Sequence, residues 1–196
     1  MRLLPNGPRA VLAEFDTLAE VMATAQAWRV AAWPGVQEVV PAARTVLVVH
    51  DGSFDTTVLL PAADVAHHDT AATVVIEVEY DGADLSAVAQ HLGGSVADVV
   101  AAHSGAPYTV AFCGFMPGFS YLVGLPPALW LPRRSTPRTR VPAGSVAIAA
   151  EFAAVYPRES PGGWHLLGRT DARLWNDERE PPALLPPGTT VRFRPR

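Results

Sequence analysis

Proline is the residue that most constrains how this chain can fold, because its ring fixes φ and removes a backbone hydrogen-bond donor. The chain has 19 prolines, and they are unevenly spread, with 5 in residues 1–98 and 14 in residues 99–196. This change in proline content indicates a boundary between two structurally different parts. The second part is expected to consist of short segments, since prolines interrupt longer helices and central strands.

The first part combines strand and helix patterns. Apolar and β-branched runs predict strands over residues 10–15, 36–40, 45–50 and 73–80. A helix is predicted over residues 17–33, because Thr17 and Glu20 form a capping box. A second helix is predicted near residues 57–67. The order strand, helix, strand, strand, helix, strand predicts a small α+β domain, ferredoxin-like or related, over residues 1–82.

The second part begins with two short helices and continues in short strands. The helices are predicted over residues 84–91 and 95–103, where they bridge the two parts. Short β segments follow at residues 108–113, 145–150, 153–156, 164–168 and 190–194. Together with the proline- and glycine-rich loops between them, these segments predict a mostly-β barrel over residues 83–196. Residues 114–141 show little periodicity, which in a compact domain indicates a functional loop.

All 15 basic residues are arginine, and the chain contains no lysine. A GC-rich genome would produce the same bias. Whatever its cause, the lack of lysine excludes from this chain a Walker-type phosphate loop, a Schiff-base amine and a biotin attachment site. With 49% hydrophobic and 17% charged residues, the composition is that of a globular chain with a sizeable core.

Charge is divided unevenly along the chain, whose net charge is −4. Residues 1–98 hold 4 arginines and 13 acids (−9), and residues 99–196 hold 11 arginines and 6 acids (+5). The basic residues match no nucleic-acid-binding motif, so we expect a small anionic ligand and no nucleic acid. Cys113 is the one cysteine, and no apolar stretch approaches the roughly 18 residues of a membrane span. We therefore expect a cytoplasmic protein that does not enter a membrane.

The loop that begins at Gly114 carries the first candidate binding residues. Gly114 and Gly118 can adopt φ > 0 on either side of Pro117, which would let backbone N–H groups approach an anion. Phe119 and Tyr121 would form apolar walls beside them. The alternative is a tight turn whose aromatic rings fill one end of the barrel.

Four arginines lie within eight residues: Arg133, Arg134, Arg138 and Arg140. A planar guanidinium binds a carboxylate or a phosphate through two parallel hydrogen bonds. We predict that at least one of Arg138 and Arg140 reaches the ligand, while Arg133 and Arg134 contact either the ligand or a partner surface. The alternative for the group is a solvated basic strip. Ser145, a little further on, would bind the same anion or cap a turn.

A third block contributes five further candidates for substrate binding: Tyr156, Ser160, Gly162, Gly163 and Trp164. The two glycines follow a proline and predict a tight turn with exposed N–H groups. The tyrosine, serine and tryptophan would line the same pocket as Tyr121. A plug in the core is the alternative for Trp164.

His103 is the candidate for acid–base catalysis. It ends a predicted helix, where the negative end of the helix dipole would raise the pKa of its imidazole. A cap or an interface residue is the alternative. His67, His68 and Asp69 resemble one corner of a metal site, but neighbouring residues point apart and no further ligand has zinc spacing. No metal site is therefore predicted.

Three long blocks together resemble one known family: GFMPGFSYLVGL at residues 114–125, PRRSTPRTRVPAGSVAI at residues 132–148 and YPRESPGGWHLLGRT at residues 156–170. They are similar to the B subunit of the bacterial ATP-dependent 5-oxoprolinase, in a family also named allophanate hydrolase subunit 1 and kinase-A inhibitor. The similarity runs from EVEYDGADL at residues 77–85 through His103 to the ending PPALLPPGTTVRFRP, and it is looser in the first part.

The resemblance implies a cyclophilin-like β-barrel in the second part, and it implies partner chains. Members of this family pair with a second cyclophilin-like chain, the C subunit, and work with a separate A subunit to open the lactam of 5-oxoproline to glutamate with ATP hydrolysis. The chain alone would then be inactive, ATP would be bound together with the partner subunits, and neither metal nor biotin would be carried here. Two alternatives stay open: an inhibitor of a sensor histidine kinase, and a carboxyltransferase subunit of the allophanate hydrolase or urea carboxylase type.

Overall fold

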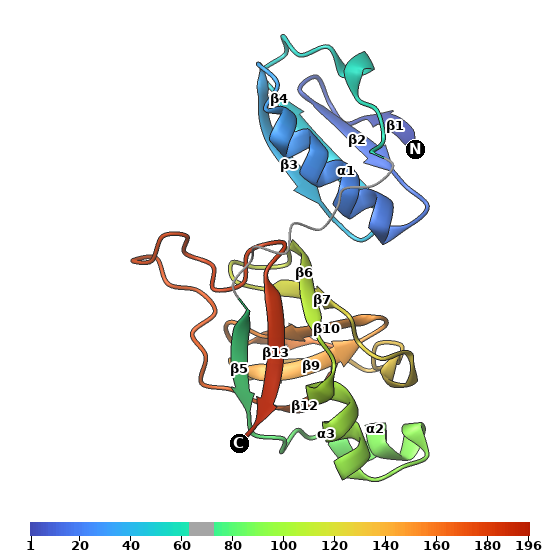
Figure 1. Ribbon diagram of the computed structural model, residues 1–196, viewed down its shortest axis with the longest axis vertical. Coiled ribbons are helices and arrows are strands. Elements are labelled where there is room, and N and C mark those ends of the chain that lie inside the picture. The colour runs from blue at the N-terminus through green and yellow to red at the C-terminus, as the bar shows by residue number, and fades with distance from the viewer. Residues whose placement is uncertain (63–72) are drawn as a thin grey trace. The chain divides into compact units, whose positions relative to one another are not determined.

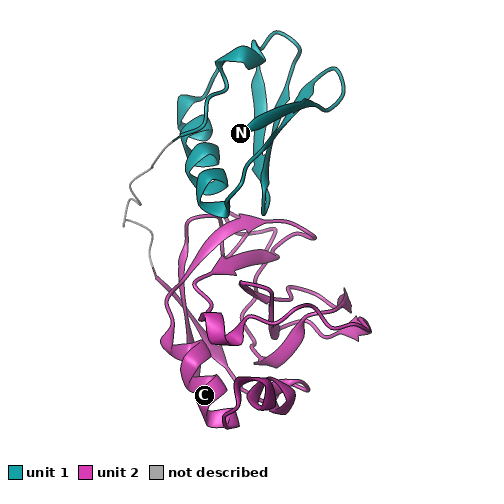
Figure 2. Ribbon diagram, turned by 90° about the vertical axis from the view of Figure 1, so that its right-hand side faces the viewer, with its two compact units in different colours: residues 1–69 teal, residues 70–196 magenta. Residues whose placement is uncertain are grey.

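The structure is a computed structural model, and it describes residues 1–62 and 73–196. The chain forms two compact units, residues 1–69 and residues 70–196, which Figure 2 shows in two colours. Of the helices in the described residues, none is long and apolar enough to cross a membrane.

The first unit is a four-stranded antiparallel sheet with one helix packed on it (Figure 1). In sheet order the strands are β1 (Arg2–Pro5), β2 (Ala10–Glu14), β4 (Thr45–His50) and β3 (Val36–Pro41). Helix α1 spans Leu18–Ala31 and begins with the predicted capping box. The hydroxyl of Thr17 accepts from the N–H of Glu20 at 3.2 Å, and the Glu20 carboxylate accepts from the N–H of Thr17 at 2.8 Å.

The predicted ferredoxin-like order is not found among the described residues. Where the second helix was predicted, the structure has a short 3-10 turn, η1 (Thr56–Val58), followed by Leu59 in an extended conformation. Leu59 is buried in the core, the carbonyl of Leu60 accepts from Trp28 Nε1 at 2.9 Å, and Pro61 disfavours helix in the residue before it. The rest of that predicted range, with His67, His68 and Asp69, lies outside the described residues.

The second unit is mostly β and forms the expected barrel-like sheet, with seven strands (Figure 1). In sheet order they are β12 (His165–Arg169), β9 (Ser145–Ala149), β10 (Phe152–Val155), β7 (Ser120–Val123), β6 (Tyr108–Cys113), β13 (Thr190–Pro195) and β5 (Val74–Val78). The other elements are a ribbon of β8 (Arg138–Val141) with β11 (Ser160–Gly162), helices α2 (Leu85–Leu92) and α3 (Val96–Gly105), and the 3-10 turn η2 (Pro127–Leu129).

Three features of this unit differ from the sequence expectations. Strand β5 was assigned to the first domain with a boundary at residue 82, but it pairs in parallel with β13, so the boundary falls after residue 69. The stretch predicted as a loop over residues 114–141 contains β7 and β8, each of only four residues, too short to show a period. The predicted turn around Gly162 is strand β11, which pairs with β8.

The barrel closes between its two edge strands, where the chain after β5 meets β12. Glu79 and Arg169 exchange backbone hydrogen bonds of 2.9 and 2.8 Å, and the N–H groups of Gly82 and Asp84 donate to carbonyls of β12 at 3.1 Å. We call this contact, between residues 79–84 and 166–169, the barrel seam. It converts an open sheet into a nearly closed one.

Two glycines make the barrel seam possible. A Cβ atom on Gly82 would lie 2.3 Å from the carbonyl oxygen of Leu166, and one on Gly168 would lie 2.3 Å from that of Glu79. Both obstacles are backbone atoms, which cannot turn aside as a flexible side chain can. Glycine is therefore required at both positions by close approach of two chain segments.

Candidate functional site

Asp84 is the charged centre of the candidate site. It precedes α2 but makes no side-chain cap; instead it is buried, with 3% of its surface exposed. Arg138 donates from Nη1 and Nη2 to its two carboxylate oxygens at 2.9 Å each, and Arg134 donates from Nη1 at 2.6 Å. The backbone N–H of Leu166 donates at 2.8 Å. One buried carboxylate therefore joins the start of α2 to β8, β12 and the loop before β8.

This group of contacts carries an excess positive charge. Burial by itself would raise the pKa of Asp84, but the hydrogen bonds from Arg138 and Leu166 and the charges of both arginines outweigh it, so the pKa lies below its ordinary value of 3.8. The carboxylate is thus ionised at neutral pH and is shared by two guanidinium groups. Arg134 keeps 33% and Arg138 23% of the side chain exposed.

Arg138 has the two-point geometry expected from its guanidinium, but the partner is Asp84 of the same chain. Both of its terminal nitrogens bond to that carboxylate. A guanidinium held in this way orients its neighbours and does not offer its two-point face to a ligand. We therefore treat Arg138 as a positioning residue.

A hollow of about 390 Å³, which we call the seam hollow, opens beside Arg138 on the barrel seam. Its lining combines three guanidinium groups and one carboxylate with small and apolar residues. The lining residues are Asp81, Gly82, Ala83, Arg138, Arg140, Pro142, Ala143, Ser145, Leu166, Gly168 and Arg169. The volume lies within the range of about 300 to 1,000 Å³ that is usual for small-molecule sites.

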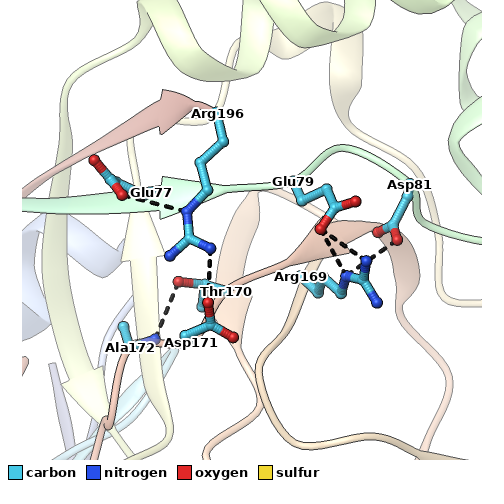
Figure 3. Close-up of polar contacts among 8 residues, drawn as sticks. All are labelled: Glu77, Glu79, Asp81, Arg169, Thr170, Asp171, Ala172 and Arg196. Carbon is cyan, nitrogen blue, oxygen red and sulfur yellow. Dashed lines mark hydrogen bonds and ion pairs between the residues drawn. The ribbon is translucent and has the colours of Figure 1, made fainter.

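Arg169 was not among the residues predicted from the sequence. Its exposed side chain joins the two segments of the barrel seam through ion pairs. Its guanidinium donates to the Glu79 carboxylate at 3.0 and 2.7 Å and pairs with Asp81 at 3.1 Å (Figure 3). Figure 3 also shows Arg196 bonded to Glu77 and Asp171 in the same way. The EVEYD segment could have indicated these arginines, because its acidic residues occupy every second position and favour basic partners nearby.

Arg140 is the guanidinium of the seam hollow that is held least firmly. Its one described ion pair is with Glu159 at 2.6 Å, and the two side chains are 75% and 51% exposed. An exposed pair contributes only about 0 to 1 kcal/mol, so Arg140 can exchange Glu159 for a ligand at little cost. Ser145 lines the same hollow, and its hydroxyl donates to the carbonyl of Pro142 at 2.8 Å. The turn-capping alternative for Ser145 is thus the one that the geometry favours.

A second hollow, of about 410 Å³, surrounds Arg133. We call it the Arg133 hollow. Two guanidinium groups, two hydroxyls, one imidazole and two apolar residues line it: Leu131, Pro132, Arg133, Arg134, Ser135, Thr136 and His165. None of these lining residues is acidic. Because Arg134 and Arg138 both bond to Asp84, that carboxylate links the two hollows.

Seven aromatic rings form a cluster beside β6, β7 and β10: Phe112, Phe115, Phe119, Tyr121, Phe152, Tyr156 and Trp164. Phe119 is at its centre, with ring centroids of four neighbours between 5.1 and 5.6 Å away. Phe119, Tyr156 and Trp164 are buried, so their rings fill the core of the unit. This was the alternative to lining a binding pocket. Burial raises the pKa of Tyr121 and of Tyr156, and the nearby charge of Arg133 partly offsets both shifts.

The loop around Pro117 forms a tight turn that differs from the prediction in detail. Gly118 adopts the predicted positive φ, at 81°, but Gly114 does not, and Phe115 takes that conformation instead, at 69°. The N–H of Met116 donates to the Gly114 carbonyl at 2.8 Å, and the N–H of Phe119 donates to the Met116 carbonyl at 3.0 Å. These two donors are used within the turn and are not offered to an anion.

The residues of β11 and the glycine that follows it lie against neighbouring segments of the same unit. A Cβ atom on Gly162 would lie 2.3 Å from the Tyr156 hydroxyl oxygen, so any larger residue there would force the buried Tyr156 ring to shift. The carbonyl of Gly163 accepts from the N–H of Arg134 at 2.8 Å. The hydroxyl of Ser160 is buried and has no hydrogen-bond partner in the part of the chain that the structure describes.

His103 lies inside the core of the second unit. None of its surface is exposed, its Nδ1 lies 2.7 Å from the Tyr80 hydroxyl, and its ring centroid lies 4.5 Å from that of Phe193. Burial lowers the pKa of His103 to about 3, so the predicted rise was wrong, because lost hydration outweighs the helix dipole. His103 lines neither hollow, so it does not belong to the candidate site.

We predict that His103 makes the fold sensitive to mild acid. The unfolded chain protonates this imidazole below its ordinary pKa of 6.5, but the folded chain does so only near pH 3. The unfolded state therefore binds the extra proton between these values, and the free energy of unfolding falls as pH drops, by up to about 1.4 kcal/mol per pH unit.

Urea unfolding between pH 4.5 and 7 measures this effect. The free energy of unfolding should change less steeply with pH for His103→Gln than for the wild type. His91→Gln, an exposed histidine on α2, is the control that should keep the wild-type slope; equal slopes in all three proteins would contradict the prediction.

Comparison with known proteins identifies the family. The family described as carboxyltransferase domain, subdomain C and D, matches residues 1–185. The chain belongs to this family. Two curated relatives, each named as the B subunit of 5-oxoprolinase, confirm the resemblance seen in the sequence. The protein of Escherichia coli O157:H7 is 49% identical over 126 residues, 63% of this chain and 58% of the relative. That of Bacillus subtilis (strain 168) is 42% identical over 112 residues, 57% of this chain and 47% of the relative.

The match to these curated relatives spans about half of their own length. Solved structures extend the likeness to nearly the whole of this chain. The crystal structure of TTHA0988 is 36% identical, has a TM-score of 0.81, and is matched over 96% of this chain and 40% of that one. The urea carboxylase of Kluyveromyces lactis has a TM-score of 0.70 at 20% identity, over 99% of this chain and 21% of that one, which shows a shared fold.

Proposed function

We propose that this chain is the B subunit of an ATP-dependent 5-oxoprolinase, which opens the lactam of 5-oxo-L-proline to L-glutamate. The names of the curated relatives support this proposal. The observation that carries it is the seam hollow, which combines apolar walls with one exchangeable guanidinium. The A and C subunits complete the active site, so this chain alone is inactive. We further propose that the barrel is of the cyclophilin-like kind and that the complex works in the cytoplasm.

The seam hollow suits the chemistry of 5-oxoproline. The substrate is a small ring with two methylene groups and one carboxylate, and Ala83, Pro142 and Leu166 offer apolar surface to the ring. Arg140 binds the carboxylate in place of Glu159, with two parallel hydrogen bonds. Arg138 stays on Asp84 and fixes the wall beside it.

The reaction explains why ATP and partner chains are needed. A lactam carbonyl is unreactive because the nitrogen lone pair is delocalised into it, and ATP supplies a phosphoryl group that makes the carbonyl carbon electrophilic. The chain has no lysine and hence no Walker-type loop, so ATP is bound together with the partner subunits. The part proposed for this chain is to bind and orient anionic groups, while the partners supply the remaining catalytic groups.

We predict that Arg140→Ala raises the KM for 5-oxoproline about ten- to a hundredfold in the assembled complex, because a charge-assisted pair with the substrate carboxylate is lost. Arg140→Lys should recover only part of the loss, since an ammonium keeps the charge but not the planar two-point geometry. The measurement is 5-oxoproline-dependent phosphate release by the three subunits expressed together.

The matched control for this experiment is Arg192→Ala. Arg192 is exposed on β13 and lines neither hollow, so its loss changes the net charge equally and should leave KM unchanged. A wild-type KM in Arg140→Ala would contradict the place of the carboxylate. Failure of the wild-type complex to turn over 5-oxoproline at all would contradict the function itself.

The family description favours one second candidate, transfer of a carboxyl group from biotin. Biotin is carried on a lysine, which this chain lacks, so a separate carrier chain would have to present it. Carboxyl transfer with such a carrier, without 5-oxoproline turnover in the complex with the A and C subunits, would select this candidate. Turnover of 5-oxoproline in the absence of biotin would reject it.

A further inference from the structure

We propose that the Arg133 hollow binds a phosphoryl group, carried either by a nucleotide or by a phosphorylated reaction intermediate. The proposal rests on the proposed function only for the identity of the phosphate compound. The site itself follows from the charges, donors and supports of the residues around Arg133.

The charges of this hollow are not neutralised as those of the seam hollow are. Each guanidinium of the seam hollow is paired with at least one carboxylate, whereas Arg133 has none within ion-pair distance among the described residues. Arg134 has only a share of Asp84, which Arg138 already binds at two points. The Nε of Arg134 is also buried without an acceptor from residues 1–62 or 73–196. Two guanidinium groups therefore line this hollow, and the single carboxylate that pairs with one of them is shared with Arg138.

The hydrogen-bond donors favour a phosphoryl group over a carboxylate. Arg133 and Arg134 supply guanidinium N–H groups, and the exposed Ser135 and Thr136 supply two hydroxyls. A terminal phosphoryl group has three oxygens pointing in different directions, while a carboxylate has two in one plane. Four separate donor side chains suit the larger number of acceptors, and a doubly charged group gains more from two guanidinium groups.

The walls of the hollow are held in place before any ligand arrives. The N–H of Arg134 donates to the Gly163 carbonyl at 2.8 Å, and its side chain is fixed by Asp84 at 2.6 Å. The Nε2 of His165 lies 2.9 Å from the carbonyl of Pro132, which ties β12 to the start of the same loop. Because these supports are already formed, Arg134 and His165 lose little conformational entropy on binding, and the main entropy cost falls on the exposed Arg133 side chain.

The test is calorimetric titration of the chain alone with inorganic phosphate, ADP and acetate at equal, low ionic strength in a buffer free of phosphate. We expect saturable binding of phosphate and of ADP at one shared site, and binding of acetate at least about tenfold weaker. Arg133→Ala should weaken phosphate binding by about tenfold or more, and Arg133→Lys should restore only part. Arg133 is exposed, so these variants should fold normally, which a thermal melt checks.

Two further variants place the site. Arg140→Ala, in the seam hollow, and Arg192→Ala, on β13, should bind phosphate as the wild type does. ADP binding at least about tenfold tighter than phosphate would support the nucleotide as the source, and equal affinities would support a phosphorylated intermediate.

Three results would overturn the proposal. The first is no saturable phosphate binding, and the second is acetate binding as tight as phosphate binding. The third is phosphate binding that is lost in Arg140→Ala but unchanged in Arg133→Ala. None of these measurements needs the assembled complex. Failure of the phosphoryl site and failure of 5-oxoproline turnover are therefore seen in separate experiments.

Discussion

Gly82→Ala should destabilise the second unit by about 3 kcal/mol or more, because the added methyl group forces the barrel seam apart. Its Cβ would lie 2.3, 2.4 and 2.5 Å from backbone atoms of Leu166 and Leu167. Either the two segments separate, and their hydrogen bonds at Gly82 and Asp84 lengthen, or the sheet loses its closing contact. For a unit of this size the melting temperature of the barrel should fall by roughly 10 °C. Gly168→Ala, which meets the Glu79 carbonyl from the other strand, should have a similar effect.

The matched control is Gly105→Ala. Gly105 ends α3 in the same unit, no heavy atom lies within 4 Å of its Cβ position, and its φ is not in the left-handed region. The substitution should be neutral or slightly stabilising, because alanine loses less backbone entropy than glycine in a helix. Calorimetry gives the melting temperature, and amide hydrogen exchange in β5 and β12 locates the loss. Equal melting temperatures for the two variants would show that the barrel seam tolerates a side chain.

The features that could be predicted from sequence are those that depend on neighbouring residues. The capping box of Thr17 with Glu20 marked the start of α1, and the helix predicted from residue 95 is α3, which Ser95 caps. Strand β6 coincides with the predicted segment at residues 108–113, and β3 and β4 coincide with the predicted hairpin to within a residue. Caps, short turns and β-branched runs act locally, so they are visible in the order of the residues.

What could not be predicted depends on pairs that are distant in sequence. The period-two pattern of β5 is the same whichever sheet it joins, and nothing local indicates its parallel partner β13. His103 was interpreted from its place at a helix end alone, because Phe193, which covers its ring, lies ninety residues further on. The prediction for its pKa had the wrong sign for that reason.

The candidate site shows the same division. The cluster of arginines was visible, and so was the ability of each to bind an anion at two points. Which anion each one binds was not visible, because Asp84 lies 50 and 54 residues before Arg134 and Arg138. Asp84 was interpreted only as the start of a helix. Asp84 becomes buried against Arg134, Arg138 and β12 only in the folded barrel, so the sequence around it does not indicate this environment.

Asp84→Asn should have the second large effect, because it leaves two guanidinium groups facing a neutral amide in a buried place. Removing one partner of a buried ion pair costs about 3 to 5 kcal/mol, and the Asn side-chain NH₂ can only repel the N–H donors around it. Arg138 and Arg134 would then lose their common anchor, so both hollows should bind their anions more weakly, even at temperatures where the barrel stays folded. The pKa of Asp84 is lowered in the folded chain, so its ionised form contributes stability above its ordinary pKa of 3.8, and that stability is lost as pH falls below it.

Two measurements separate this buried cluster from an ordinary surface pair. Glu159→Gln removes the exposed partner of Arg140 and should change the free energy of unfolding by less than about 1 kcal/mol. In a double-mutant cycle, Asp84→Asn combined with Arg138→Met should lower the free energy of unfolding by clearly less than the sum of the two single changes. The reason is that each single change leaves a charged or polar partner unpaired, and the double change removes both partners. Urea unfolding at pH 7 gives all of these free energies. Additive costs, or an Asp84→Asn variant as stable as Glu159→Gln, would mean that Asp84 does not hold the arginines, and the link between the two hollows would have to be abandoned.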